Sequence, residues 1–290
     1  MQRLFKRQER AVVPVLPDGN SALIAMWLHG RPETTQAAYR SDITRLLGFL
    51  EDKPLNSVTL PDLQRFADSL ADLAPGSQAR ILKACKSILT FGCKTMPQFF
   101  PINAGAALRM PKAEGKLAQR ILSESEVLTM IQQEPEARNR LILRLLYISG
   151  VRRAELCSAR WRDLQERPEA RAGQITVFGK GSKERAVVLT PGVWGMLQQY
   201  SRCVISEPGY LIFNLSASQI YRIVREAARR AGIEKPVSPH WMRHAHASHA
   251  LDRGAPISLV QATLGHESVQ TTGKYLHARP GESSSKYLPS

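Results

Sequence analysis

Hydrophobic residues recur with helical periodicity through the first third of the chain. The segment 34–52 places its apolar residues on one stripe, which is the spacing of a helix with one buried face. A second helix is predicted over 60–73, because Thr59 can cap it and Pro61 suits a first turn. A third helix is predicted over 76–94. The pattern therefore predicts a helical N-terminal domain.

The periodicity changes in the second half of the chain. Prolines and glycines interrupt it before residue 121, so 111–120 is read as a linker between a domain at 1–110 and a second at 121–281, with a polar tail at 282–290. The second domain opens with Ser123 and Glu126 at the spacing of a helix capping box. Further helices are predicted over 217–232, 238–254, 256–266 and 268–278. Between them, 173–190 alternates apolar and polar residues around a glycine-rich turn, which predicts a β-hairpin.

Composition indicates a basic protein that binds a polyanion. The 290 residues carry a formal net charge of +15, and both predicted domains are basic. Each phosphate that Lys or Arg neutralises releases counterions and adds affinity at low salt. Charge alone does not separate DNA from RNA or from an acidic membrane surface. The chain lacks both an apolar run of membrane-spanning length and a signal peptide, so a cytoplasmic location and no membrane partner are expected.

Several basic residues are candidates for contacts with phosphates. In the helix predicted over 76–94, positions 80, 83 and 86 are basic, which suits either a phosphate backbone or a solvated face. The candidates for DNA binding are Arg80, Lys83, Lys86, Lys183, Arg222 and Arg225. Lys183 and Arg185 also fit a simpler role, that of keeping the hairpin solvated.

The stretch 238–254, SPHWMRHAHASHALDRG, concentrates histidines in one predicted helix. Ser238 can cap it, and His240, Arg243 and His244 share a face. A metalloprotease motif HExxH needs a glutamate between its histidines, and an arginine repels a divalent cation, so no metal site is predicted. An arginine and a histidine at a helix start suit an anion such as phosphate. In isolation, the stretch also fits core histidines beside an arginine paired to an acid.

Four other segments supply residues of the same kind. Arg152 follows a glycine at a predicted helix end, with Glu155 three residues later to orient its guanidinium. Lys180 lies in the hairpin turn, His266 follows another glycine, and Tyr275 comes nine residues after it. The motifs are SGVRRAEL, GKGSKER, HWMRHAHASH and LGHESVQTTGKY.

In this order the set resembles the tyrosine recombinase (phage integrase) family, and the layout is similar to that of bacterial Xer recombinases over about residues 20–280. The resemblance implies a mainly helical protein with a small β-hairpin or sheet. Its helical core-binding domain and its α+β catalytic domain form a clamp around DNA. The catalytic residues implied are Arg152, Lys180, His240, Arg243, His266 and Tyr275. His246 departs from the family, in which an aromatic residue is frequent at that position, and Gly273 lies unusually close to Tyr275.

The implied reaction is cleavage of a DNA strand by Tyr275, which leaves a 3′-phosphotyrosyl bond and a free 5′-hydroxyl, followed by rejoining to another strand. Two guanidinium groups match the charge that builds on the phosphate oxygens. His240 is the candidate general base, Lys180 the proton donor to the leaving oxygen, and His266 a phosphate ligand, although which group deprotonates the phenol stays open. No cofactor is expected: the phosphotyrosyl bond conserves energy, and the nearest approach to a P-loop has the wrong spacing.

Two other functions compete with recombination. A type IB topoisomerase uses similar residues to cut and reseal one strand, and a regulator can retain the fold without catalysis. The partners expected for a recombinase are double-stranded DNA and further protomers, as a tetramer on two sites or together with a second recombinase. His244 and His249 are read as packing residues of the helix.

Overall fold

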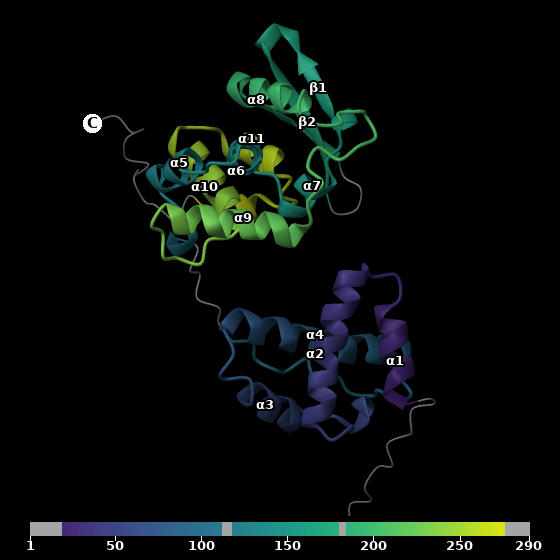
Figure 1. Cartoon of the computed structure of the whole chain (residues 1–290). Helices are drawn as coiled ribbons and strands as arrows, with labels where there is room; N and C mark the ends of the chain where they lie inside the picture. Colours follow the sequence, from purple (N-terminus) through teal and green to yellow (C-terminus); the bar gives the residue numbers. More distant parts are fainter. Residues whose placement is uncertain (1–18, 112–117, 180–183, 276–290) are drawn as a thin grey trace, which may run out of the picture. The chain divides into compact units, whose positions relative to one another are not determined.

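The computed structural model describes residues 19–111, 118–179 and 184–275, which form two compact units, Met1–Glu114 and Gly115–Ser290. The boundary between the units falls inside the segment 111–120. Both units are mainly helical, and the second contains a small antiparallel sheet (Figure 1), as the pattern predicted. Among the described residues, no helix is long and apolar enough to cross a membrane.

The first unit is built from helices around one apolar core. Its elements are α1 (Gly19–Leu28), α2 (Glu33–Phe49), the 3₁₀ turn η1 (Leu55–Ser57), α3 (Leu60–Asp68) and α4 (Pro75–Thr95). Helix α4 is the longest of them, and its apolar face packs against α1 and α2. Ile43 and Leu46 of α2 and Cys85 and Ile88 of α4 are fully buried in this core, which accounts for the apolar stripes of the sequence.

Helix α3 begins as its sequence predicts but ends early. The Thr59 side chain accepts a hydrogen bond from the Asp62 backbone N–H, and the Thr59 backbone N–H donates to the Asp62 carboxylate, which completes a capping box. The helix stops at Asp68, and turns occupy the rest of the predicted 60–73. Burial would raise the pKa of Asp62, but hydrogen bonds from Lys53 and Thr59 outweigh burial and lower that pKa well below its usual range.

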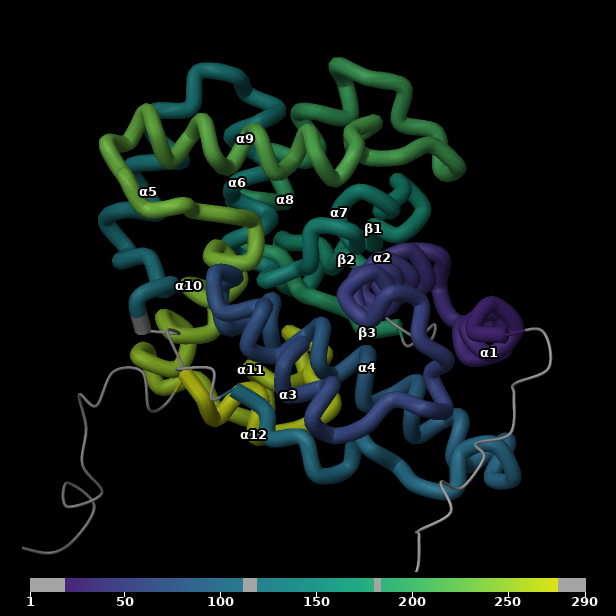
Figure 2. Tube along the Cα trace, turned by 90° about the horizontal axis from the view of Figure 1, so that it is seen from below, coloured from purple at the N-terminus to yellow at the C-terminus, as the bar shows by residue number. Residues whose placement is uncertain are grey.

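The second unit carries more elements. They are η2 (Ala118–Arg120), α5 (Glu124–Gln132), α6 (Ala137–Ser149), α7 (Arg153–Ser158), η3 (Trp161–Asp163), β1 (Leu164–Arg167), η4 (Pro168–Ala170), β2 (Ala172–Phe178), β3 (Glu184–Val188), α8 (Pro191–Ser201), α9 (Ala217–Arg230), α10 (Pro239–Asp252), α11 (Ile257–Leu264) and α12 (Val269–Gly273). Ser123 and Glu126 form the predicted capping box of α5. Helix α10 packs on α6, α5 and α11, while α11 also contacts α12 and β3. Figure 2 shows α6 and α10 between α9 on one side and α11 and α12 on the other.

The sheet has the order β1-β2-β3 with antiparallel neighbours. Strands β2 and β3 form the hairpin that the alternating pattern predicted, with Thr176 opposite Ala186. Strand β1 was not predicted, because its four residues, LQER, contain a single apolar residue and no alternation. It joins the sheet by pairing with β2, with Leu164 opposite Ile175.

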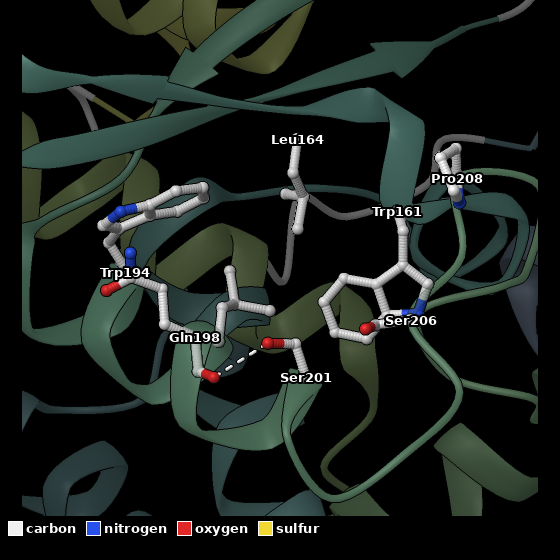
Figure 3. A pocket seen from close by; sticks show the side chains of 8 residues that line it. Trp161, Leu164, Trp194, Gln198, Ser201, Ser206 and Pro208 are labelled. Atoms are coloured by element: carbon white, nitrogen blue, oxygen red, sulfur yellow. Dashed lines mark hydrogen bonds between the residues drawn. The ribbon is translucent and has the colours of Figure 1, made fainter.

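Helix α8 packs against β2 and fixes one side of the sheet. Trp194 of α8 lies so close to Gly173 that a Cβ on this glycine would be 2.2 Å from the indole ring. Trp194 and Trp161 line a cavity of about 280 Å³ together with Leu164 (Figure 3). The sheet is thus held to the helical core by large aromatic side chains.

Candidate active site

The site is organised around the close approach of α6, α10 and α11. Helix α6 ends at Ser149, and its C-cap residue Gly150 adopts the left-handed conformation with φ of 59°. A Cβ there would lie 2.6 Å from Leu264 Cδ2 and 2.8 Å from the ring of His246. Gly150 therefore serves two needs at once, a positive φ and a contact too tight for any side chain. The chain then turns directly into Arg152.

Arg152 occupies the N-cap position of α7 and is held by Glu155. Its Nη1 donates to Glu155 Oε1 at 2.8 Å, its backbone N–H donates to Glu155 Oε2 at 2.8 Å, and its Nη2 reaches the Gly265 carbonyl at 3.4 Å. The predicted role of Glu155 as the residue that orients Arg152 matches this geometry. The Arg152 side chain is 40% exposed, so part of the guanidinium faces solvent.

Glu155 receives a second guanidinium, from Arg185 of β3. Arg185 Nη1 and Nη2 donate to the two carboxylate oxygens at 3.0 and 2.8 Å. Burial would raise the pKa of Glu155, but the hydrogen bonds from Arg185 and Arg152 lower it to about 2. The expectation that Arg185 keeps the hairpin solvated is wrong, because only 12% of its side chain is exposed.

Helix α10 presents Arg243 at the centre of the unit. The residue is 1% exposed, and its Nη1 and Nη2 donate to the carbonyls of Gly150 and Leu264, each at 2.5 Å. Burial and, after it, the charge of Arg152 lower the pKa of Arg243 to about 10. Ser238 precedes the helix as predicted, but its side chain makes no capping hydrogen bond. Arg243 is therefore a buried cation anchored by backbone oxygens.

The phenol of Tyr275 reaches this cluster from the segment after α12. Tyr275 is 6% exposed and packs among Ile121, Ala247 and Leu264. Its hydroxyl lies 2.7 Å from Nδ1 of His244. Burial raises the pKa of Tyr275 although Arg243 opposes the shift, so the phenol is protonated and shares this hydrogen bond with a neutral imidazole.

The pKa values of the histidines in the site are all lowered, which favours their neutral forms. Partial loss of hydration, followed by the charges of Arg243, Arg152 and Arg120, lowers the pKa of His240. Burial and then His240 lower the pKa of His244 to about 3, and the two rings meet edge to face with centroids 4.4 Å apart.

His266 completes the cluster at the turn after α11. Its Nδ1 lies 2.8 Å from the Thr272 hydroxyl, and burial followed by the charges of Arg243 and Arg152 lowers its pKa to about 4. Arg152, Arg185 and His266 line a cavity of about 520 Å³. Neutral histidines among arginines leave the site with an excess of positive charge that a phosphate group would compensate.

The structure thus brings Arg152, Arg243, His240, His266 and Tyr275 into one region. Lys180 and Lys183 lie outside the described residues. His244 was interpreted as a packing residue and not as a partner of the phenol, whose hydroxyl it contacts. The signal available was its position four residues after His240, on the same helix face. For Arg185 no local signal exists, because its partners lie 30 and 78 residues away in the chain.

The other candidates for DNA binding have differing surroundings. Arg80 forms an ion pair with the buried Asp42, and Lys86 donates to the carbonyls of Ala106 and Leu108 at 3.2 and 2.9 Å. The remaining candidates in the described ranges are exposed, namely Lys83, Arg222 and Arg225. Lys86 is partly occupied with the structure of the first unit, whereas these three are free to meet solvent or a ligand.

His246, which departs from the family pattern, lies at the close contact of α10 with α6. Its Nδ1 is 2.8 Å from the Tyr147 carbonyl. His249 was predicted, together with His244, to be a packing residue; its Nδ1 lies 2.9 Å from the Tyr147 hydroxyl, and the residue is 5% exposed. Both side chains join α10 to α6.

A buried phenol, two guanidinium groups and a set of histidines suit attack on a phosphodiester. Residues 118–282 match the phage integrase family. XerC of Xanthomonas campestris is 33% identical over 258 residues, covering 84% of this chain and 78% of its own, and XerD of Pseudomonas putida is 33% identical over 279 residues, covering 88% and 90%.

Solved structures show the same fold. The chain is similar to the XerH recombinase in a post-cleavage complex with palindromic difH, with a TM-score of 0.74 at 20% identity, covering 88% of this chain and 79% of that one. It is also similar to XerA, with a TM-score of 0.51 at 27% identity, covering 93% and 98%. The chain therefore belongs to the phage integrase family and is an enzyme of the tyrosine-type site-specific DNA recombinases.

Proposed function

We propose that Tyr275 is the nucleophile of DNA strand exchange. The phenol loses its proton and its oxygen bonds to the scissile phosphorus, while the bond from phosphorus to the 5′ oxygen breaks and that oxygen takes up a proton. In the second step, the 5′-hydroxyl of another strand attacks the phosphotyrosyl phosphorus and the phenol is released with a proton. The observation that supports this assignment most directly is the convergence of the Tyr275 hydroxyl with helix α10, which carries both His240 and Arg243.

Arg152 and Arg243 are proposed to bind the nonbridging oxygens of the phosphate. Arg243 uses two of its nitrogens on carbonyls, and a guanidinium carries five N–H donors, so donors remain for an anion. A fixed donor of this kind typically contributes about 10²- to 10³-fold in rate. His266 is proposed as a further phosphate ligand. Lys180, outside the described residues, is proposed to protonate the leaving oxygen.

The proton of Tyr275 is proposed to go to His240. This histidine is neutral because its pKa is lowered, which a general base at neutral pH requires. His244 touches the phenol directly but has a pKa of about 3, too low for it to keep the proton of a phenol. We therefore propose that His244 holds the phenol at rest and that His240 acts once DNA has displaced Tyr275 from it.

The unit at 1–110 is proposed to bind DNA through the basic face of α4, on which Arg80 and Lys83 are exposed and Lys86 is half-buried. Lys183, Arg222 and Arg225 are proposed as phosphate contacts of the second unit, at 121–281. The lambda integrase forms a tetramer bound to a Holliday junction, and by analogy we propose a tetramer on two DNA sites. We also propose a cytoplasmic location, and we expect no ATP or other cofactor because the phosphotyrosyl bond conserves the energy of the phosphodiester.

A nicked duplex that traps the covalent intermediate tests the nucleophile. The wild-type protein should form a denaturation-resistant adduct whose phosphate is joined to Tyr275, and Tyr275→Phe should form none. An adduct that persists in this variant would show that another residue attacks. The target sequence for the duplex would come from sequencing DNA trapped on the protein in its host.

Plasmid assays separate recombination from relaxation alone. Exchange between two sites on one plasmid changes the connectivity of the DNA, whereas a topoisomerase changes only its linking number. Relaxation without exchange on plasmids that carry the sites would contradict the recombinase assignment. Binding without any adduct in the wild-type protein would indicate a regulator.

A further inference from the structure

Arg185 links three separate segments of the second unit. It lies on β3, its two terminal nitrogens donate to Glu155 at the start of α7, and its Nε donates to the Thr263 carbonyl at 2.7 Å. A Cβ on Gly265 would lie 3.1 Å from Arg185 Cδ, so the side chain also lies flat against the turn after α11.

The Glu155 carboxylate is saturated only when both guanidinium groups are present. Oε1 accepts from Arg152 Nη1 and Arg185 Nη1, and Oε2 accepts from the Arg152 backbone and Arg185 Nη2, at 2.8 to 3.0 Å. Because Arg185 occupies one side of the carboxylate with two parallel hydrogen bonds, Glu155 cannot rotate freely. The hydrogen bond from the Arg152 side chain to Glu155 Oε1 therefore has a fixed direction.

The same side chain also constrains the turn that carries His266. Arg185 holds the carbonyl of Thr263, Arg152 Nη2 reaches the carbonyl of Gly265, and His266 follows directly. Arg185 thus contacts the supporting residues of two proposed phosphate ligands, Arg152 and His266, which come from distant parts of the chain. Arg185 commits each of its three nitrogens to the protein and is 12% exposed, so it is poorly placed to bind a phosphate itself.

We propose that Arg185 is a positioning residue for strand cleavage, which fixes the guanidinium of Arg152 through Glu155 and the His266 turn through Thr263. This inference rests on the proposed function. A displacement of about 1 Å in a reacting group can cost about 10²-fold in rate. Replacing Arg185 is therefore expected to slow cleavage while DNA binding is retained.

The experiment compares Arg185→Gln and Arg185→Lys with the wild type in single-turnover formation of the adduct on a nicked duplex, beside the Kd for an intact duplex at fixed salt. We expect Arg185→Gln to slow cleavage by about 10- to 100-fold with the Kd within about 3-fold. Arg185→Lys should be intermediate, because a lysine supplies charge without a fork. If Arg185→Gln does not fold, Arg185→Lys decides: a rate equal to that of the wild type overturns the proposal.

A double-mutant cycle separates positioning from general structural support. In an Arg152→Lys background the fork at position 152 is already lost, so Arg185→Gln should slow cleavage by a smaller factor than it does in the wild type, and the remaining effect reflects the His266 turn. An undiminished effect in this background would mean that Arg185 does not act through Arg152. The matched control is Arg230→Gln, which removes an arginine paired with the buried Glu134 on other elements, and its folded form should cleave at the wild-type rate. A wild-type protein that forms no adduct would instead refute the proposed function.

Discussion

Arg243 is expected to matter far more for cleavage than for folding. It is nearly inaccessible, and its guanidinium is anchored by the carbonyls of Gly150 and Leu264. The informative change is Arg243→Met, which keeps much of the side-chain length and removes the charge and the donors. The comparison is Arg230→Met, because Arg230 is paired with Glu134, a carboxylate that is only 2% exposed.

The magnitudes follow from the surroundings of each arginine. Lowering the pKa of Arg243 from 12.5 to about 10 means that its charge is disfavoured by about 3 kcal/mol in the folded state. Its two charged hydrogen bonds contribute about 1.5–3 kcal/mol each, so the two effects largely cancel. Arg243→Met should lower the free energy of unfolding by less than about 3 kcal/mol. Arg230→Met leaves a buried carboxylate unpaired, which typically costs about 3–5 kcal/mol.

The assay pairs urea unfolding with single-turnover formation of the phosphotyrosyl adduct. Arg243→Met should cleave at least about 10²-fold more slowly than the wild type. Arg230→Met should lose more stability, yet its folded molecules should cleave normally. The reasoning is refuted if Arg243→Met is the less stable of the two, since the buried charge would then be structural. A cleavage rate within 10-fold of the wild type would refute the catalytic role.

Three further predictions concern stability and binding. Folding lowers the pKa of His244 from its usual 6.5 to about 3, so the unfolded state binds more protons than the folded state below pH 6.5. Lowering the pH from 7 to 5 should therefore remove about 2 kcal/mol of stability through this group. Urea unfolding at both pH values should show a smaller loss in His244→Gln, and an equal loss would contradict the prediction. Gly173→Ala should destabilise by about 1–3 kcal/mol because its Cβ would collide with Trp194, whereas Gly195→Ala, with nothing within 4 Å, should not destabilise in thermal unfolding. Lys83→Ala should reduce the slope of log K against log salt by about 0.9; an unchanged slope would remove this residue from the DNA contacts.

Local signals in the sequence predicted the elements that local interactions determine. The capping residues Thr59 and Ser123 begin α3 and α5, and the alternation over 173–190 produces the hairpin of β2 and β3. Strand β1 escaped prediction because its pairing with β2, rather than its own composition, makes it a strand. The helix predicted over 60–73 ends earlier, at Asp68, because turns follow although apolar residues continue to residue 73.

In the site too, contacts between residues close in sequence were predictable, whereas contacts between distant residues were not. The order of motifs along the chain indicated which residues to examine, and the contact between Arg152 and Glu155 follows from their spacing of three. The contact of His244 with the Tyr275 hydroxyl spans 31 residues, and no periodicity encodes it. Arg185 was misjudged for the same reason: an arginine near a hairpin turn resembles any solvated arginine until the carboxylate behind it is known.

The anchoring of Arg243 by two backbone carbonyls has an evolutionary consequence. Any amino acid at position 264 offers the same carbonyl oxygen, so a substitution there leaves this acceptor in place wherever the main-chain path is kept. Gly150, whose φ of 59° and tight surroundings exclude a side chain, is constrained by geometry rather than by chemical identity. Sequence divergence can therefore proceed widely around this arginine without displacing it.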